Sequence, residues 1–205
     1  MSVLNNSKAE SLRETRNLTK VAVLGVTAFL LMTFLEFPLP MFPTFLKMDL
    51  SDLPALLAGF GMGPWAAVLV EVVKNLLHAI FKNQTAFVGE IANFLTGVLY
   101  VVPASLVYAA RKTKANAVIG MILGTISMAL GMALANYYIF LPLYAKIFNM
   151  PLEAIVSMGS SVNSRVVDLK TLVVYSIIPF NVLKGVLIMA ITLLIYKKVS
   201  PLLHM

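Results

Sequence analysis

The chain has 205 residues, of which 60% are hydrophobic and 12% are charged, and its mean hydropathy is +0.89. A soluble domain has about 45–50% apolar and about 25% charged residues, so this composition excludes an ordinary soluble protein and indicates a single integral membrane domain. The sequence contains no cysteine, which excludes a disulfide framework and a thiolate metal or redox centre. In a membrane protein, a net charge of +7 reflects basic cytoplasmic ends more often than nucleic-acid binding.

Apolar runs predict six transmembrane helices that form one all-α bundle. The second run is shorter than the roughly 20 helical residues that cross a hydrocarbon core. We therefore expect the second helix to pack inside the bundle rather than against lipid. The predicted spans cover approximately residues 21–41, 53–62, 64–81, 86–110, 116–145 and 171–196.

Lysine and arginine counts predict the orientation. With the N-terminus inside, nine of these residues lie in cytoplasmic segments and five in outside loops, which favours two cytoplasmic termini in the cell membrane. Residues 1–20 are then a cytoplasmic segment and residues 21–198 the membrane domain. No cleavable signal is expected, because the polar start leads directly into a full-length span. The extracellular loops are expected near 42–52, 82–85 and 146–170, and the last of these is either flexible or partly helical.

The segment 37–54, between the first two predicted spans, is unusual for a connector. Its prolines limit helix formation, and residues such as Phe42 and Phe45 are too apolar for a solvated loop. It could cover the mouth of the bundle as a lid, or it could rest on the membrane interface. Ser51 or Asp52 is expected to cap the helix that follows.

The third predicted span carries a polar stripe. Glu71, Lys74, Asn75 and His78 recur at intervals of three and four residues and therefore share one helical face. Glu71 and Lys74 can neutralise each other, which lowers the cost of burial. The stripe is either a proton or ion pathway or, as we favour, an internal ion pair that fixes helix packing. A metal site at His78 is not predicted, because no second histidine lies near it in the sequence.

The last two predicted spans contain three polar side chains in their outer halves. Lys184 lies in the middle of an apolar run, and Asn181 precedes it by one helical turn on the same face. Asn136 lies in the span before. An asparagine offers both donors and an acceptor, whereas lysine only donates, so together they could recognise a heterocycle edge that alternates carbonyl and N–H groups. Taken alone, each asparagine more often joins two helices than contacts a ligand, but three such groups with an apolar loop on the same side favour a pocket.

Several blocks of the sequence, in order, resemble one family. They are the runs 46–64 and 70–78, Asn136-Tyr-Tyr-Ile-Phe-Leu-Pro142 and Pro179-Phe-Asn-Val-Leu-Lys-Gly185. These blocks resemble the riboflavin-binding S component of energy-coupling factor (ECF) transporters, and the similarity covers nearly the whole chain from the first span onward. The resemblance implies six transmembrane helices and a riboflavin site near the extracellular face.

The resemblance also implies roles for individual residues. Asn136, Asn181 and Lys184 would hydrogen-bond the polar edge of the isoalloxazine ring. Further contacts would come from the lid loop and the fourth span, at Thr44, Leu46, Met48, Asn93 and Gly97.

The resemblance implies partners as well. Members of the family bind the substrate but do not hydrolyse ATP, and they join a transmembrane T component that carries two ATPases. This chain has no Gly-x-x-x-x-Gly-Lys-Ser/Thr phosphate loop. In the family, an Ala-x-x-x-Ala pattern in the first span contacts the T component. Here Ala22 is followed by Val26, so the pattern is broken, and Ala22, Gly25 and Ala28 offer the comparable flat face.

The residues are also compatible with other functions. An S component for another heterocyclic vitamin or for FMN is one alternative, although a phosphate favours arginines or a helix N-terminus and Lys184 is the one obvious pocket cation. An autonomous proton-coupled carrier would use Glu71 and Lys74. A membrane enzyme based on Glu71 and His78 is least favoured, because no nucleophile is paired with a base. Riboflavin is expected as the transported substrate, with no cofactor, no enzymatic activity and no nucleic-acid partner.

Overall fold

The computed structural model describes residues 2–204, and it describes their side chains over residues 15–195. Four of the predicted cytoplasmic charges, Lys8, Arg13, Lys197 and Lys198, lie outside the described side chains, as does His204. The helices are α1 Ser2–Phe34, α2 Asp52–Met62, α3 Pro64–Phe81, α4 Val88–Ala110, α5 Lys114–Ala135, α6 Leu141–Ile147, α7 Leu152–Ser160, α8 Leu169–Leu172 and α9 Ile178–His204. Two π-helical segments, η1 (Asn136–Phe140) and η2 (Val173–Ile177), join α5 to α6 and α8 to α9.

Five helical segments within the described part of the chain are long and apolar enough to cross a membrane. They are Thr15–Phe34, Pro64–Phe81, Val88–Ala110, Lys114–Ile147 and Leu169–Ile195. The sixth predicted span is α2, which lies where the sequence predicts it but has only 11 residues, too few to cross a hydrocarbon core. Eight of those residues are buried, so α2 packs inside the bundle as expected.

The first predicted span differs from α1. The helix ends at Phe34 rather than near residue 41, because the prolines at 38, 40 and 43 cannot continue it. Residues 35–51 instead form a loop with one short hairpin, in which β1 (Phe37–Pro38) pairs antiparallel with β2 (Lys47–Met48). We call residues 35–51 the lid loop. The predicted loop at 146–170 is partly helical, since it contains α7.

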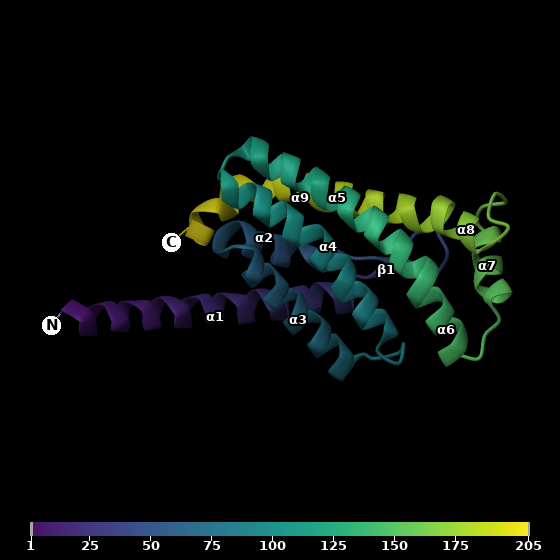
Figure 1. Ribbon diagram of the computed structural model, residues 1–205, viewed down its shortest axis with the longest axis horizontal. Coiled ribbons are helices and arrows are strands. Elements are labelled where there is room, and N and C mark those ends of the chain that lie inside the picture. Colours follow the sequence, from purple (N-terminus) through teal and green to yellow (C-terminus); the bar gives the residue numbers. More distant parts are fainter. Residues whose placement is uncertain (1, 205) are drawn as a thin grey trace.

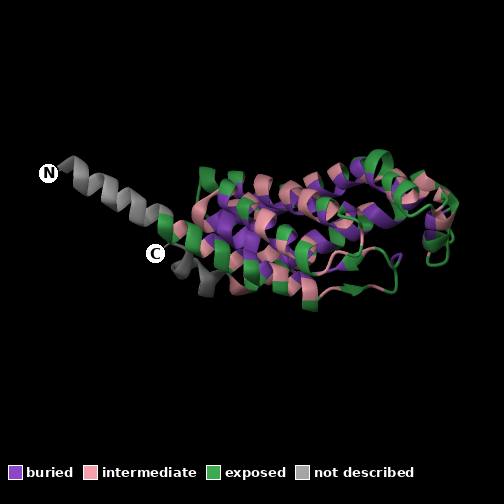
Figure 2. Ribbon diagram, turned by 90° about the horizontal axis from the view of Figure 1, so that it is seen from below, coloured by how far each residue is buried: buried purple, intermediate pink, exposed green. Residues whose placement is uncertain are grey.

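Both ends of the chain lie at one end of the molecule. In Figure 1 the start of α1 and the end of α9 are together on the left, and α6, α7 and α8 lie at the opposite end. We call the end with α6, α7 and α8 the loop end. Buried residues line the inside of the bundle between the helices (Figure 2), with side chains such as Phe60 and Tyr108 in ring contact at 4.5 Å.

The helices α4 and α5 approach each other at glycines. A Cβ atom on Gly120 would lie 2.6 Å from the Ala104 carbonyl oxygen, and one on Gly124 would lie 2.3 Å from that of Tyr100. Only glycine allows two helical backbones to come this close, as is common for helix pairs in membranes. The contact holds α4 and α5 against each other.

Candidate substrate-binding site

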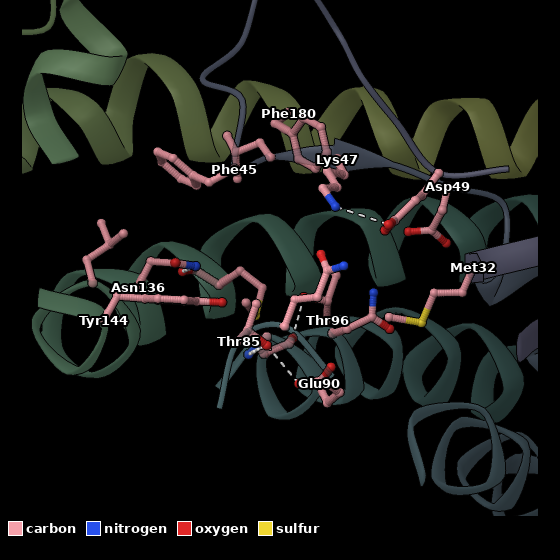
Figure 3. Close-up of a pocket in the computed structure, with 18 of the residues that line it drawn as sticks. Met32, Phe45, Lys47, Asp49, Thr85, Glu90, Thr96, Asn136, Tyr144 and Phe180 are labelled. Atoms are coloured by element: carbon pink, nitrogen blue, oxygen red, sulfur yellow. Dashed lines mark hydrogen bonds and ion pairs between the residues drawn. The ribbon is translucent and has the colours of Figure 1, made fainter. Parts of the chain in front are cut away.

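A cavity of about 350 Å³ lies at the loop end, between α4, the α5–α6 helix, α9 and the lid loop. Its size is within the range of small-molecule sites, about 300–1,000 Å³. Figure 3 shows Phe45 and Phe180 on one side of it and Thr85 and Glu90 on the opposite side. Most of the wall is apolar, and polar groups enter it at several places. This combination is typical of a ligand pocket.

Five of the eight predicted site residues line this cavity. They come from the lid loop, α4, η1 and α9, which are distant in the sequence, and they are Leu46, Asn93, Asn136, Asn181 and Lys184. The structure therefore brings together the three polar residues that the sequence singled out.

The other three predicted residues do not line the cavity. Thr44 is exposed on the lid loop. Met48 is buried behind the cavity wall, where it packs with Phe42 and Phe180. Gly97 instead faces α3: a Cβ atom there would lie 2.3 Å from the carboxyl carbon of Glu71. Its small size makes room for a buried carboxylate rather than for a ligand.

The two π-helical segments have a common cause. Each ends two residues before a proline: η1 before Pro142 and η2 before Pro179. A proline lacks the N–H for the helical bond, and its ring collides with the carbonyl four residues earlier, so widening the preceding turn relieves the clash. The wide turns lie at the cavity, where they set the positions of Asn136 and Asn181.

The two asparagines bond in the same way. Asn136 Nδ2 donates to the Met132 carbonyl at 2.8 Å, and Asn181 Nδ2 donates to the Ile177 carbonyl at 2.9 Å. Each bond to a backbone carbonyl uses one N–H of the side-chain amide. The side-chain oxygen and the second N–H of each asparagine therefore remain available. Both asparagines can therefore accept and donate toward a ligand while their rotamers are held by the helix.

Lys184 is 2% exposed and is not a free cation. Its Nζ lies 3.0 Å from Asp49 Oδ2 and 2.9 Å from Asp52 Oδ2. Both aspartates were missed as site residues, since Asp52 was expected only as a possible helix cap and no role in the site was predicted for Asp49. The available signal was two acidic residues in an apolar run that leads into a short, buried helix.

The ion pairing continues into the bundle. Lys74 Nζ lies 2.7 Å from Asp52 Oδ1 and 2.6 Å from Glu71 Oε2, and all three side chains are inaccessible to solvent. The predicted Glu71–Lys74 pair is therefore present, and the structure adds Asp52 to it. We call Glu71, Lys74, Asp52, Lys184 and Asp49 the buried ion chain.

The expected side-chain cap of α2 is wrong. The Asp52 carboxylate forms ion pairs with the two lysines, and the Ser51 side chain makes no capping hydrogen bond. Instead the Ser51 N–H donates to Asp49 Oδ1 at 2.8 Å, and the Ser51 hydroxyl donates to the same oxygen. Charge compensation inside an apolar bundle outweighs a cap, because an unpaired buried ammonium costs several kcal/mol, about 2.5–3.5 on insertion scales, and a lost cap about 1.

A second polar group enters the cavity from α3 and α4. Glu90 lies 3.0 Å from His78 Nδ1 and accepts a hydrogen bond of 2.8 Å from the Thr85 hydroxyl. His78 Nε2 and Asn93 Oδ1 are buried without a hydrogen-bond partner among the described residues. Buried polar atoms are usually paired, so these two atoms leave hydrogen-bonding capacity unused beside the cavity wall.

The turn before α4 presents Thr85 and Glu90 to the cavity. Ala86 and Phe87 have positive φ angles of 48° and 68°, a conformation that costs energy for residues other than glycine. The Asn83 side chain holds the turn, since its oxygen accepts from the N–H groups of Thr85 and Phe87. Strained backbone of this kind is typical of functional sites.

Glu36 fastens the lid loop. Its carboxylate accepts from Lys47 on β2 at 3.0 Å and from Lys82 after α3 at 2.9 Å. Burial raises the pKa of Glu36, but the hydrogen bonds and charges of the two lysines outweigh this effect and lower its pKa below the ordinary value of 4.5. Glu36 is therefore ionised at neutral pH, and the lid loop is tied to α3. Of the two readings of this loop, a lid agrees with its place against the cavity.

The predicted partner face on α1 is mostly turned inward. Ala28 is fully buried, and a Cβ atom on Gly25 would lie 2.5 Å from Val73 of α3. Small residues at these positions allow α1 and α3 to pack closely. Of the three residues, only Ala22 is exposed to a partner in this structure.

Known proteins are similar to this chain in sequence and in fold. The sequence model of the family "ECF transporter, substrate-specific component" matches residues 16–196. The riboflavin transporter RibU of Staphylococcus aureus is 34% identical over 98% of each chain. The riboflavin transporter FmnP of Bacillus subtilis is 35% identical over 92% of this chain and 94% of its own.

A solved structure agrees with these matches. The S component of a bacterial ECF transporter superposes with a TM-score of 0.73 at 33% identity, over 93% of this chain and 98% of that one. The five long apolar helices and the match to a transporter family show that this chain is a membrane protein with a transport role. The chain belongs to the substrate-specific (S) components of ECF transporters.

Proposed function

We propose that this chain captures riboflavin from the extracellular side in the cavity at the loop end. The observation that carries the proposal is the convergence of Asn136, Asn181 and Lys184 on one apolar cavity, in a chain similar to proteins named riboflavin transporters. A flavin ring is flat and largely apolar, with carbonyl and N–H groups along one rim. The carbonyl and N–H groups of this rim can hydrogen-bond with the donors and acceptors of these three side chains.

The cavity has a place for each part of the ligand. The asparagine oxygens and N–H groups and the Lys184 ammonium contact the polar rim of the ring. Phe45 and Phe180 provide flat apolar surface on the lid side. The hydroxylated side chain of riboflavin extends toward His78, Glu90 and Asn93, which are polar residues of the cavity wall.

Charge favours riboflavin over FMN. The cavity is lined by three lysines, and each is paired: Lys47 and Lys82 with Glu36, and Lys184 with two aspartates. A phosphate would find no unpaired cation among the described lining residues and would lie near Glu36 or Glu90. Another heterocyclic vitamin remains the second candidate, since the same three polar groups would suit a similar rim.

Delivery into the cell requires partners. As an S component, the chain works with a transmembrane T component and two ATPases, and the lid loop faces the outside while both termini lie in the cytoplasm. The paired state of Glu71 and Lys74 favours this reading over an autonomous proton-coupled carrier, because both groups are sealed from the cavity. An uptake assay separates the two mechanisms. An S component transports only when ATP and the partner subunits are present, whereas an autonomous carrier transports without them.

The binding proposal is tested on the purified protein. The protein is isolated in detergent and its absorption recorded across the flavin bands, and the ligand is released by denaturation and identified. Riboflavin fluorescence is then titrated with ligand-free protein, with FMN and a vitamin of unrelated structure in parallel. Bound riboflavin with tight quenching is expected; a colourless protein that quenches no riboflavin fluorescence overturns the proposal.

A further inference from the structure

We infer that Asp52, which does not line the cavity, is the positioning residue for the Lys184 ammonium, and this inference rests on the proposed riboflavin site. Asp52 is fully buried at the start of α2. Its two oxygens serve different lysines: Oδ1 meets Lys74 and Oδ2 meets Lys184. Among the described residues it is the one side chain that contacts both.

The geometry of an ammonium explains the role. A lysine ammonium has three N–H donors in a tetrahedral arrangement. Asp49 accepts one of those of Lys184, and the Asp52 carboxylate holds the ammonium from a second side by an ion pair at 2.9 Å, so the position and orientation of the ammonium are restricted. Because Lys184 lines the cavity, an N–H that Asp49 does not use is available to a ligand carbonyl. A donor held in place before binding loses little entropy when the ligand arrives.

The two aspartates are themselves held. Asp49 is fixed by the Ser51 N–H and hydroxyl on its other oxygen. Asp52 is fixed by Lys74, which in turn is held by Glu71 on the same helix, α3. The position of Lys184 on α9 is therefore set from the lid loop on one side and from α2 and α3 on the other.

The charges of the buried ion chain permit a clean test. The buried ion chain contains three carboxyl groups and two lysines. Asp52→Asn removes one negative charge and leaves two separate ion pairs, Glu71–Lys74 and Asp49–Lys184. Glu71→Gln replaces an equally buried carboxyl group that contacts Lys74 and Asn75 but not Lys184. The second variant is thus a matched control for burial and helix packing.

The expected result is a difference between these two variants. Asp52→Asn should lower riboflavin affinity by about tenfold or more, as for a misdirected hydrogen bond from a charged group. Glu71→Gln should lower it by less than about threefold, although both variants lose thermal stability to a similar degree. A purely structural ion chain predicts equal effects on affinity, and that outcome overturns the inference.

A double-mutant cycle tests the route through Lys184. If Asp52 acts by directing that ammonium, Asp52→Asn has no further effect on affinity in the Lys184→Met/Asp49→Asn background, which keeps the net charge of the buried ion chain. Additive losses contradict the role. Should Asp52→Asn alone fail to fold, the same change is made in a Glu71→Gln/Lys74→Met background, where it leaves the single pair Asp49–Lys184 and no unpaired buried charge.

The wild-type titration separates the two proposals. Absence of quenching by the wild-type protein overturns the riboflavin assignment. Quenching that is equal in the wild type and in Asp52→Asn leaves that assignment standing and removes Asp52 as the positioning residue.

Discussion

The carboxylate of Asp49 lies 3.0 Å from the ammonium of Lys184, a residue 135 positions further along the chain. Asp49 belongs to the lid loop and Lys184 to α9, so one ion pair joins the cover of the cavity to its wall. A ligand carbonyl that bonds Lys184 therefore enters a network that already includes the lid. If Lys184 binds the substrate as proposed, its ion pair with Asp49 joins the bound substrate to the lid loop.

Replacing Lys184 should abolish tight binding, but the matching charge has to be removed with it. Lys184→Met alone leaves three buried carboxylates with one lysine, and such uncompensated charge destabilises a folded protein by several kcal/mol, about 3–5. Lys184→Met/Asp49→Asn keeps the original net charge of the buried ion chain. We expect this double variant to fold and to bind riboflavin more than about tenfold more weakly in a fluorescence titration.

Asp49→Asn by itself serves as the reference for that experiment. The difference between it and the double variant reports the contribution of Lys184. If the double variant is well folded and binds riboflavin as tightly as the reference, Lys184 is not part of the binding site.

Asn181→Leu should weaken riboflavin binding by about tenfold, because it deletes an acceptor and a donor that face the polar rim of the ring while retaining the side-chain volume. Its matched control is Asn75→Leu. Asn75 is also buried and also donates to the carbonyl four residues earlier, but it does not line the cavity. Isothermal titration should show lost affinity for the first variant only; equal losses would mean that both asparagines act through helix packing.

Acidification should loosen the lid through Glu36. Its pKa lies below 4.5, so the stabilisation from its bonds to Lys47 and Lys82 is fully present above that pH and is lost as the pH falls through the folded-state pKa. Partly exposed ion pairs are worth about 0.2–1 kcal/mol, so we expect riboflavin dissociation to accelerate by roughly two- to fivefold.

Stopped-flow dissociation across this pH range measures the effect. Glu36→Gln should already dissociate at the faster rate at neutral pH and show little further change on acidification. A variant that keeps the full pH dependence would assign the effect to another group.

Pro179→Ala should disturb the site without harming the fold. Alanine supplies the missing N–H and removes the ring clash, so the helix can close its wide turn at η2, which shifts Asn181 relative to the residues before it. Thermal stability should stay the same or rise, because a proline within a helix costs about 3 kcal/mol relative to alanine. Riboflavin affinity should fall several-fold in the same sample, and an unchanged affinity would show that η2 does not set the binding geometry.

Hydropathy and local chemistry were enough to predict most of the helices. The predicted 64–81 is α3 as observed, and 86–110 differs from α4 by two residues at its start, because long apolar runs with turn residues at their ends carry a strong local signal. The end of the first span was wrong by several residues, since apolar residues of the lid loop continue the hydropathy of the helix past the point where prolines stop it. The α7 helix was not predicted as a separate element, because a helix of nine residues is too short to give such a signal.

The sequence by itself determined which side chains are costly to bury: Glu71, Lys74, Asn136, Asn181 and Lys184 each stand out in an apolar span. Only the tertiary structure decided how each is compensated. Asp49 and Asp52 reach Lys184 across 135 and 132 positions, and Glu90 reaches His78 from the next helix. Such partners depend on how the helices cross, and no periodicity within one helix records that arrangement.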